Sequence, residues 1–352
     1  MKSFAMTAVC QAGQSHGLGH LTRTLALTNE FGTGSITVIV VGDDALEDRL
    51  SFDSEKNAKV VWVRNQGELS ALLTRSKPDC LVLDAADLDS VRLVQLAAPG
   101  LTVLLSPLLD TPMTPTIHVH RGSKLPERWD RRRDCEYALG IEFAVVPPQV
   151  GRHRTRAPRA SHFAANDEDG SITLGLAAGA RPSTQTLQVF ASILSALHNL
   201  SPSPRVLISG LDDGSLTGRL GSVGIDANRL SFVPEQDPWS VLTSAHLVVT
   251  SGGQSLIEAA ALGVPSVAVP RLPMQFEVAE LLASRGACVV ISGEACRLNE
   301  EIEHVLPWIS QIVARSESGI RLEPWIDDLG AWRIAQLILD CVQMERNEMC
   351  YR

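Results

Sequence analysis

Short apolar runs alternate with amphipathic segments along the first half of the chain. The sequence predicts strands at 4–10, 36–41, 60–63, 80–83 and 101–105, and a helix that begins near His20. Such alternation is typical of a parallel sheet with crossover helices. Because helices cover both faces of such a sheet, its strands should be almost continuously apolar, as residues 38–41 are. The first half is therefore expected to be a doubly wound α/β domain.

The same alternation restarts after residue 170. Strands are expected at 172–176, 206–209, 230–233, 247–250 and 266–269, with helices over 185–197 and from about Ser255. Residues 151–170 are polar, rich in Arg and Asp, and show no hydrophobic period, which is typical of a linker. We therefore expect a first domain over 1–150, a linker over 151–170 and a second Rossmann-like domain over 171–324.

The final segment, 325–352, has the period of an amphipathic helix. Ile334, Leu337, Ile338 and Cys341 recur at helical spacing. This segment is expected to be a closing helix. A chain of 352 residues suits two α/β domains, each with a sizeable core.

Composition and charge narrow the classes of function. The hydrophobic share of 45% and the charged share of 20% are typical of a folded, soluble protein. A net charge of −9 argues against nucleic-acid binding, which depends on clustered Lys and Arg. An anionic ligand must then be held by local features. The basic run over 128–133 fits a solvated loop better than a grip on an anionic lipid surface or acceptor.

Cysteine usage and hydropathy bear on the compartment. The seven cysteines are scattered, odd in number and never in CxxC spacing, which favours a reducing cytoplasm. The apolar start of the chain leads directly into a glycine-rich motif, so we interpret it as a first strand rather than a leader. No run reaches the roughly eighteen apolar residues of a spanning helix, so any membrane contact is expected to be peripheral.

The first motif with chemical content lies between the first strand and the first helix. Gly17 and Gly19 allow a tight turn and a close approach of the backbone to a ligand. The helix that follows offers amide groups and partial positive charge to an anion. Thr22 stands where the dinucleotide fingerprint GxGxxG has its third glycine, so a nicotinamide cofactor is weakly supported.

His20 is the candidate general base of this motif. At a helix N-terminus the dipole disfavours imidazolium, so a neutral ring can accept a proton. The alternative is a histidine that only caps the helix or contacts an anion. The coincidence of strand, glycines, histidine and helix favours the base. Arg23, one turn later, is interpreted either as a ligand-facing residue or as part of a solvated or interdomain salt bridge.

The second motif lies at a later strand-to-helix junction. Gly252 and Gly253 permit close approach, Ser251 and Ser255 can donate hydroxyl groups, and Gln254 opens the helix. Backbone amides and the helix dipole can cradle a phosphate without a basic residue. This arrangement predicts an anion site on an acidic chain.

Three further residues are assigned around this loop. Glu258 falls on the helix face of Gln254 and Ser255, where its carboxylate can accept hydrogen bonds from two ribose hydroxyls. Gln275 either bonds a sugar or only starts a helix. Gly179, in a loop taken to span 175–179, either lines a diphosphate or only turns the chain.

Rival motifs fit less well. Residues 13–17 match GxSxG, but no earlier strand exists to supply an oxyanion-hole loop. Asp87 and Asp89 form a DxD that suits a helix cap better than a metal site. The chain has no HExxH, CxxC or Walker A pattern, so no metal and no cofactor are expected.

The motifs over 17–23 and 251–270, followed by Gln275, resemble the GT-B superfamily that includes the N-acetylglucosaminyltransferase making lipid II. The chain is still more similar to the UDP-sugar hydrolases of pseudaminic acid biosynthesis and their spore-coat polysaccharide relatives. That resemblance extends over nearly the whole chain, through 15–27, 80–89, 140–146 and 252–259.

The resemblance implies a GT-B fold with two Rossmann-like domains facing across a cleft, and it assigns roles to individual residues. It makes His20 the catalytic histidine and Glu258 the residue that holds the ribose. Phe232 and Val233 would lie beside the uracil, and residues 251–255 would form the diphosphate loop. In the hydrolases water attacks the anomeric carbon, whereas in the transferases an acceptor hydroxyl attacks.

The sugar site departs from the hydrolase pattern. The resemblance places Gln275 near the donor sugar, but Ala85 and Ala86 follow Asp84 where an aromatic residue is usual. Residues 106–107 replace a common acidic pair, and Pro147 replaces a usual Arg. We expect a nucleotide-sugar enzyme that transfers to a sugar or small-molecule acceptor, with hydrolysis by water, or binding without catalysis, as alternatives.

Overall fold

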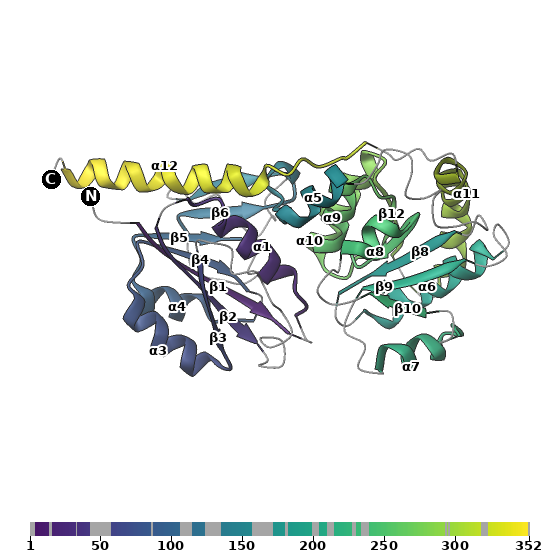
Figure 1. The fold of residues 1–352 in the computed structure, drawn as a ribbon, viewed down its shortest axis with the longest axis horizontal. Coiled ribbons are helices and arrows are strands. Elements are labelled where there is room, and N and C mark those ends of the chain that lie inside the picture. The colour runs from purple at the N-terminus through teal and green to yellow at the C-terminus, as the bar shows by residue number, and fades with distance from the viewer. Residues whose placement is uncertain are drawn as a thin grey trace. The chain divides into compact units, whose positions relative to one another are not determined.

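The computed structural model describes most of the chain. The described residues are 4–13, 16–32, 34–42, 58–85, 87–105, 115–123, 135–156, 172–179, 182–198, 204–209, 215–226, 230–233, 239–292, 294, 296–317 and 323–350. They form two compact units (Figure 1). Unit 1 comprises Met1–Pro147 together with Asp328–Arg352, and unit 2 comprises Pro148–Asp327.

Unit 1 contains a seven-stranded parallel sheet in the order β3-β2-β1-β4-β5-β6-β7. Its strands are β1 (Ala5–Ala12), β2 (Ser35–Gly42), β3 (Ala58–Val63), β4 (Cys80–Asp84), β5 (Leu101–Leu104), β6 (Ile117–His120) and β7 (Glu136–Leu139). Its helical elements are α1 (Gly19–Thr28), α3 (Gln66–Ser76), α4 (Ser90–Ala97), the 3-10 turn η1 (Ile141–Phe143) and α12 (Gly330–Cys350). The doubly wound architecture predicted for the first half is confirmed.

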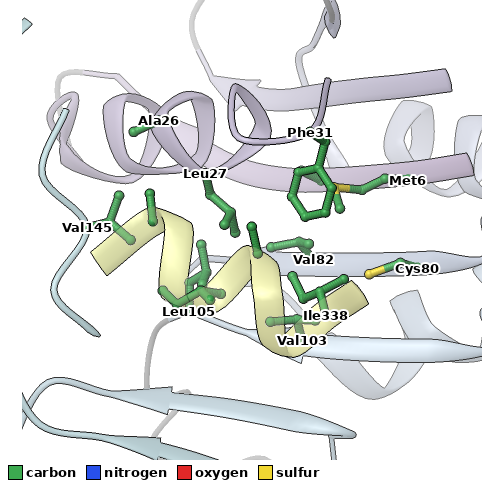
Figure 2. Close-up of a cluster of buried hydrophobic side chains, with 14 of the residues drawn as sticks. Met6, Ala26, Leu27, Phe31, Cys80, Val82, Val103, Leu105, Val145 and Ile338 are labelled. Carbon is green, nitrogen blue, oxygen red and sulfur yellow. The ribbon is translucent and has the colours of Figure 1, made fainter. Parts of the chain in front are cut away.

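Two layers of helices cover the sheet of unit 1. On one face, α1 and α12 pack on the strand residues that share the parity of Met6 and Val82. Figure 2 shows Leu27 of α1 and Ile338 of α12 pointing into this cluster. On the opposite face, α3 and α4 pack on the residues that share the parity of Val9. The alternation along each strand therefore decides which side chains lie beneath α1.

Unit 2 contains a six-stranded parallel sheet in the order β10-β9-β8-β11-β12-β13. Its strands are β8 (Thr173–Ala177), β9 (Arg205–Ser209), β10 (Leu230–Val233), β11 (Leu247–Thr250), β12 (Ser266–Ala268) and β13 (Cys288–Val290). Its helices are α5 (Pro148–Arg156), α6 (Thr184–Leu197), α7 (Ser215–Ser222), α8 (Trp239–Ser244), α9 (Gln254–Leu262), α10 (Pro273–Ser284) and α11 (Leu298–Glu317). A second Rossmann-like domain is thus confirmed.

Local sequence signals explain several helix ends. Asn65, Asp89 and Ser183 each accept a hydrogen bond from a first-turn amide of α3, α4 and α6, respectively, as N-cap residues do. Gly263 ends α9 in the left-handed conformation, with φ of 70°, which glycine adopts without strain. Asp89 therefore has the helix-capping role that the sequence favoured over a metal site.

The segment boundaries differ in two places from those expected. Residues 148–156, which include the first part of the expected linker, form α5 and pack on α8 and α9. The rest of the linker, 157–170, lies outside the described residues. The closing helix α12 belongs to unit 1, because its apolar stripe completes the core beneath α1. No helix of the described residues has the length and apolar character needed to cross a bilayer.

Candidate functional site

Both sheets reverse their strand order once, and most of the candidate residues lie near these points. In unit 1 the reversal lies between β1 and β4, and in unit 2 it lies between β8 and β11. In open α/β sheets, ligands bind outside the carboxyl ends of the strands at such a switch point. Each unit therefore has one position where a ligand site is expected from topology alone.

In unit 1 the loop after β1 forms a closed turn. Gly13 and Gly17 exchange two backbone hydrogen bonds, of 3.2 and 2.7 Å between nitrogen and oxygen. Gly17 has a φ of 70°, a conformation that favours glycine. The N-cap residue of α1, Leu18, makes no side-chain capping bond. No side chain of the N-cap residue therefore bonds to the first-turn amides of α1.

The side chain of His20 lies against the end of β4. Its Nδ1 is 2.7 Å from Oδ1 of Asp84, and its side chain is 20% exposed. Asp84 is fully buried and also accepts hydrogen bonds from Nε and Nη2 of Arg23, the first at 2.7 Å. His20, Arg23 and Asp84 form one cluster, which we name the His20 cluster.

The charge on Asp84 orients the histidine ring. Burial alone would raise the pKa of Asp84, but the attraction of Arg23 and of His20 outweighs it and holds the pKa far below its ordinary range. Asp84 is therefore an ionised carboxylate that accepts a hydrogen bond from Nδ1–H of His20. The Arg23 Nη2 to Nδ1 separation of 3.1 Å is longer than the 2.7 Å to Asp84, which favours the same tautomer. Nε2 is left as the ring atom that can accept a proton.

The cluster revises two expectations about α1. Arg23 is neither solvated nor interdomain, because it is only 4% exposed and pairs with Asp84 inside unit 1. His20 is not the N-cap, since α1 begins at Gly19 after Leu18. From the sequence alone, Asp84 was mentioned only as the residue before Ala85 and Ala86, and no role was assigned to it. A buried strand that ends on a lone Asp was the signal available, and its partners lie more than sixty residues away.

A second histidine lies at the rim of the same loop. Nε2 of His16 is 2.7 Å from Oδ2 of Asp87, whose side chain is 71% exposed. The backbone amide of Asp87 donates to Oε1 of Gln11 at the end of β1. The segment after β4 is thereby tied to the glycine loop after β1. Ser15, Ala86, residues 106–107 and residues 128–133 lie outside the described residues.

In unit 2 the loop between β11 and α9 has the expected backbone. Gly252 has a φ of 74°, and its amide donates to Oγ1 of Thr250 at 3.3 Å. Gly253 is the N-cap of α9 and brings no side chain to the helix start. Ser251, Gln254 and Ser255 lie on the same turn. A glycine turn followed by a helix N-terminus is a backbone arrangement that can bind an anion.

The loop after the neighbouring strand β8 lies beside this helix start. Ala177 of β8 pairs with Thr250 of β11, so Gly179 emerges at the same edge. Gly179 has a φ of 79°, and a Cβ there would meet nothing within 4 Å. Gly175, which the sequence placed in this loop, lies within β8 instead. A Cβ at Gly175 would be 2.9 Å from Val241 of α8, so that glycine serves helix packing.

Glu258 lies one turn into α9 and is 8% exposed. Its Oε1 accepts a hydrogen bond from Nε2 of Gln254 at 3.3 Å. The structure thus places both residues on one helix face next to the glycine turn. Glu258 is therefore not an ordinary surface residue, because a Glu is rarely buried unless it is paired.

Gln275 has the helix-entry role, and its amide nitrogen also lies near the loop. Its Oε1 accepts from the backbone amides of Arg271 and Leu272 at 2.9 and 3.1 Å. Its Nε2 lies 3.7 Å from the position of a Cβ on Gly253. The capping bond fixes the side chain, so the Nε2 group is held beside the glycine turn.

Phe232 and Val233 lie at the carboxyl end of β10. They share a sheet edge with the loop over 251–255, but β9 and β8 stand between β10 and β11. Three strand spacings correspond to roughly 14 Å. These two residues therefore lie at the edge of the unit 2 site rather than at its centre.

Comparisons with known proteins agree with this architecture. No protein-family model matches the chain. An uncharacterized protein of Methanocaldococcus jannaschii is 22% identical over 268 residues, which are 74% of this chain and 54% of that protein. The chain thus spans about half the length of the curated relative it matches.

Solved structures match over nearly the whole chain. MurG of Acinetobacter baumannii is 14% identical, covers 96% of this chain and 99% of its own, and has a TM-score of 0.52. UDP-GlcNAc 2-epimerase of Neisseria meningitidis, bound to UDP-GlcNAc, is 12% identical, with coverage of 95% and 99% and a TM-score of 0.60. A MnaA–UDP structure from S. aureus is 10% identical, with coverage of 95% and 96% and a TM-score of 0.59. At these identities the likeness is one of fold, and the fold is GT-B.

Proposed function

We propose that this chain is a GT-B enzyme that acts on a UDP-sugar and transfers the sugar to an acceptor hydroxyl. The observation that carries the proposal is the His20 cluster at the switch point of unit 1, in a chain whose second switch point holds a glycine turn and a buried carboxylate. MurG, and the epimerase solved with UDP-GlcNAc, share the fold. The finer likeness to pseudaminic-acid hydrolases or spore-coat proteins stays a prediction.

In the proposed mechanism, unit 2 holds the nucleotide. The first turn of α9 and the amides of residues 251–255 would contact the diphosphate, where the helix dipole compensates the charge of the leaving group. Glu258 would accept hydrogen bonds from the ribose. Phe232 and Val233 would border the base, and Gly179 and Gln275 would line the diphosphate and sugar.

The proposed chemistry in unit 1 uses the orientation of His20. Asp84 accepts the hydrogen bond from Nδ1–H, so Nε2 is the basic atom. Nε2 would take the proton of the acceptor hydroxyl as its oxygen attacks the anomeric carbon and UDP departs. Asp84 would then stabilise the imidazolium that forms, as the carboxylate does in other histidine-based sites. The same steps with water as acceptor give hydrolysis, the second candidate function.

The test is UDP release from a panel of UDP-sugars, measured with and without sugar acceptors. Release that requires an acceptor supports transfer, whereas equal release in water alone supports hydrolysis. His20→Ala should lower the rate by roughly 10²–10⁴-fold, the usual contribution of a general base. The matched control is His304→Ala, at an exposed position of α11. Unchanged turnover in His20→Ala would refute the base, and binding of UDP-sugar without any turnover would leave a binding protein.

A further inference from the structure

Arg121 lies on the α1 face of the unit 1 sheet. It directly follows β6 and shares the strand parity of Ile117 and Val119, which belong to the core beneath α1 and α12. In the sheet order, β5 alone separates β6 from β4. The carboxyl end of β6 therefore brings Arg121 to the same edge and the same face as Asp84.

The side chain of Arg121 is buried, and two of its nitrogen atoms are unsatisfied among the described residues. The residue is 7% exposed, and within the described part of the chain its Nε and Nη1 have no hydrogen-bond partner. Buried arginines are almost always paired, because an isolated charge in the interior is costly. Burial, together with repulsion from Arg23, lowers the pKa of Arg121 to about 9 against the attraction of Asp84. The side chain remains a cation at neutral pH.

The neighbouring carboxylate cannot supply the missing bonds. Oδ1 of Asp84 accepts from Arg23 and His20, and Oδ2 accepts from Arg23 and from Oγ1 of Thr24 at 3.5 Å, which fills its four acceptor positions. Among the described residues of this cluster, two guanidinium groups therefore face one carboxylate. The buried excess of positive charge contrasts with the net charge of −9 for the whole chain. An anion from outside the cluster would offset this excess charge and accept hydrogen bonds from Nε and Nη1 of Arg121.

We propose that Arg121 forms an anion subsite in unit 1, and that the small molecule which reacts beside His20 carries a carboxylate or phosphate that occupies it. The second half of this statement rests on the proposed function, whereas the anion subsite itself does not. The substrate class is thereby narrowed to an acidic sugar or an acidic acceptor.

Matched ligands that differ only in charge test the subsite. The binding of glucuronate and of glucose 6-phosphate should each be compared with that of glucose by calorimetric titration. Because hydrogen bonds to charged groups are worth about 1.5–3 kcal/mol, at least one of the two anions should bind about tenfold or more tightly than glucose. The anion that binds identifies a carboxylate or a phosphate site. A comparison of the affinities for UDP-glucuronate and UDP-glucose shows whether the negative charge belongs to the donor sugar.

Substitution of the arginine separates a ligand site from a structural role. Arg121→Met should abolish the preference for the anion, whereas Arg92→Met, at an exposed position of α4, should preserve it. Without ligand, Arg121→Met should melt at the same or a higher temperature than the parent, because an unmatched buried charge is removed. Arg23→Met, which breaks a pair, should melt lower. Destabilisation of Arg121→Met equal to that of Arg23→Met would show that Arg121 is structural and would overturn the inference.

The outcomes also separate this inference from the proposed function. If the parent protein prefers the anion, Arg121→Met loses this preference, and neither binds UDP, the subsite is supported and the proposed nucleotide-sugar activity is refuted. If the protein binds UDP but binds charged and neutral ligands with equal affinity, the subsite alone is refuted. The same conclusion follows if the protein binds UDP but neither anion shows saturable binding.

Discussion

Replacement of Asp84 by Asn removes one charge from the His20 cluster while it preserves shape. Arg23 is 4% exposed and directs two donors at Asp84. An asparagine amide offers only one acceptor oxygen, so one Arg23 donor would face an NH₂ group. Arg23 would also be left as a buried cation, beside the second cation Arg121.

The expected loss of stability follows from this geometry. Breaking a buried ion pair by removal of one partner costs about 3–5 kcal/mol. For a unit of this size, each kcal/mol shifts the melting temperature by about 2–4 °C, so the unit 1 transition should fall by roughly 6–20 °C. Differential scanning calorimetry and urea denaturation followed by circular dichroism would measure it.

The matched control is the same substitution at the surface. Asp87 also pairs with a histidine at 2.7 Å, but its side chain is 71% exposed. Asp87→Asn should change the free energy of unfolding by no more than about 1 kcal/mol, because surface pairs contribute little. If Asp84→Asn and Asp87→Asn lowered the free energy of unfolding equally, the argument that burial makes the Asp84 pair stabilising would be refuted.

Three further predictions follow from unit 2 and from the opposite face of unit 1. Glu258→Gln should remove the preference of the protein for UDP over 2′-deoxy-UDP, and a preference retained in titrations would exclude Glu258 from the ribose. Gly252→Ala should weaken UDP binding about tenfold or more, because its φ is 74° and the new Cβ would lie 3.3 Å from Pro270. Gly179→Ala, with a similar φ of 79° but open space around the new Cβ, should bind UDP more tightly than Gly252→Ala. Burial, together with His120, lowers the pKa of His118 from 6.5 to about 4. As the pH falls, the histidine is therefore protonated in the unfolded chain before it is protonated in the folded chain. The free energy of unfolding should fall by about 3 kcal/mol between pH 6.5 and pH 4. His118→Gln should reduce this pH dependence, measured by urea denaturation at several pH values.

The pattern of apolar residues was sufficient for most of the architecture. Runs such as 38–41 and 247–250 fall within β2 and β11, because strands covered on both faces need continuous apolar sequence. Strands β6, β7 and β13 were not predicted. His118 and His120 interrupt the apolar pattern of β6, and β7 begins with Glu136. The glycine turns before α1 and α9 were also predicted, because backbone conformation there depends on local sequence.

The chemistry of the unit 1 site was decided by tertiary structure. His20 stood out by itself, but the sequence left Arg23 open between a ligand-facing residue and a solvated or interdomain salt bridge, and Arg121 gave no local signal at all. Asp84 joins His20 and Arg23 across 64 and 61 residues. These partners meet because β4 lies next to β1, so that the carboxyl end of β4 comes beside the helix that follows β1. Local sequence therefore determines where strands end and helices begin, whereas the strand order determines which buried charges become neighbours, since Coulomb energy depends on distance in space.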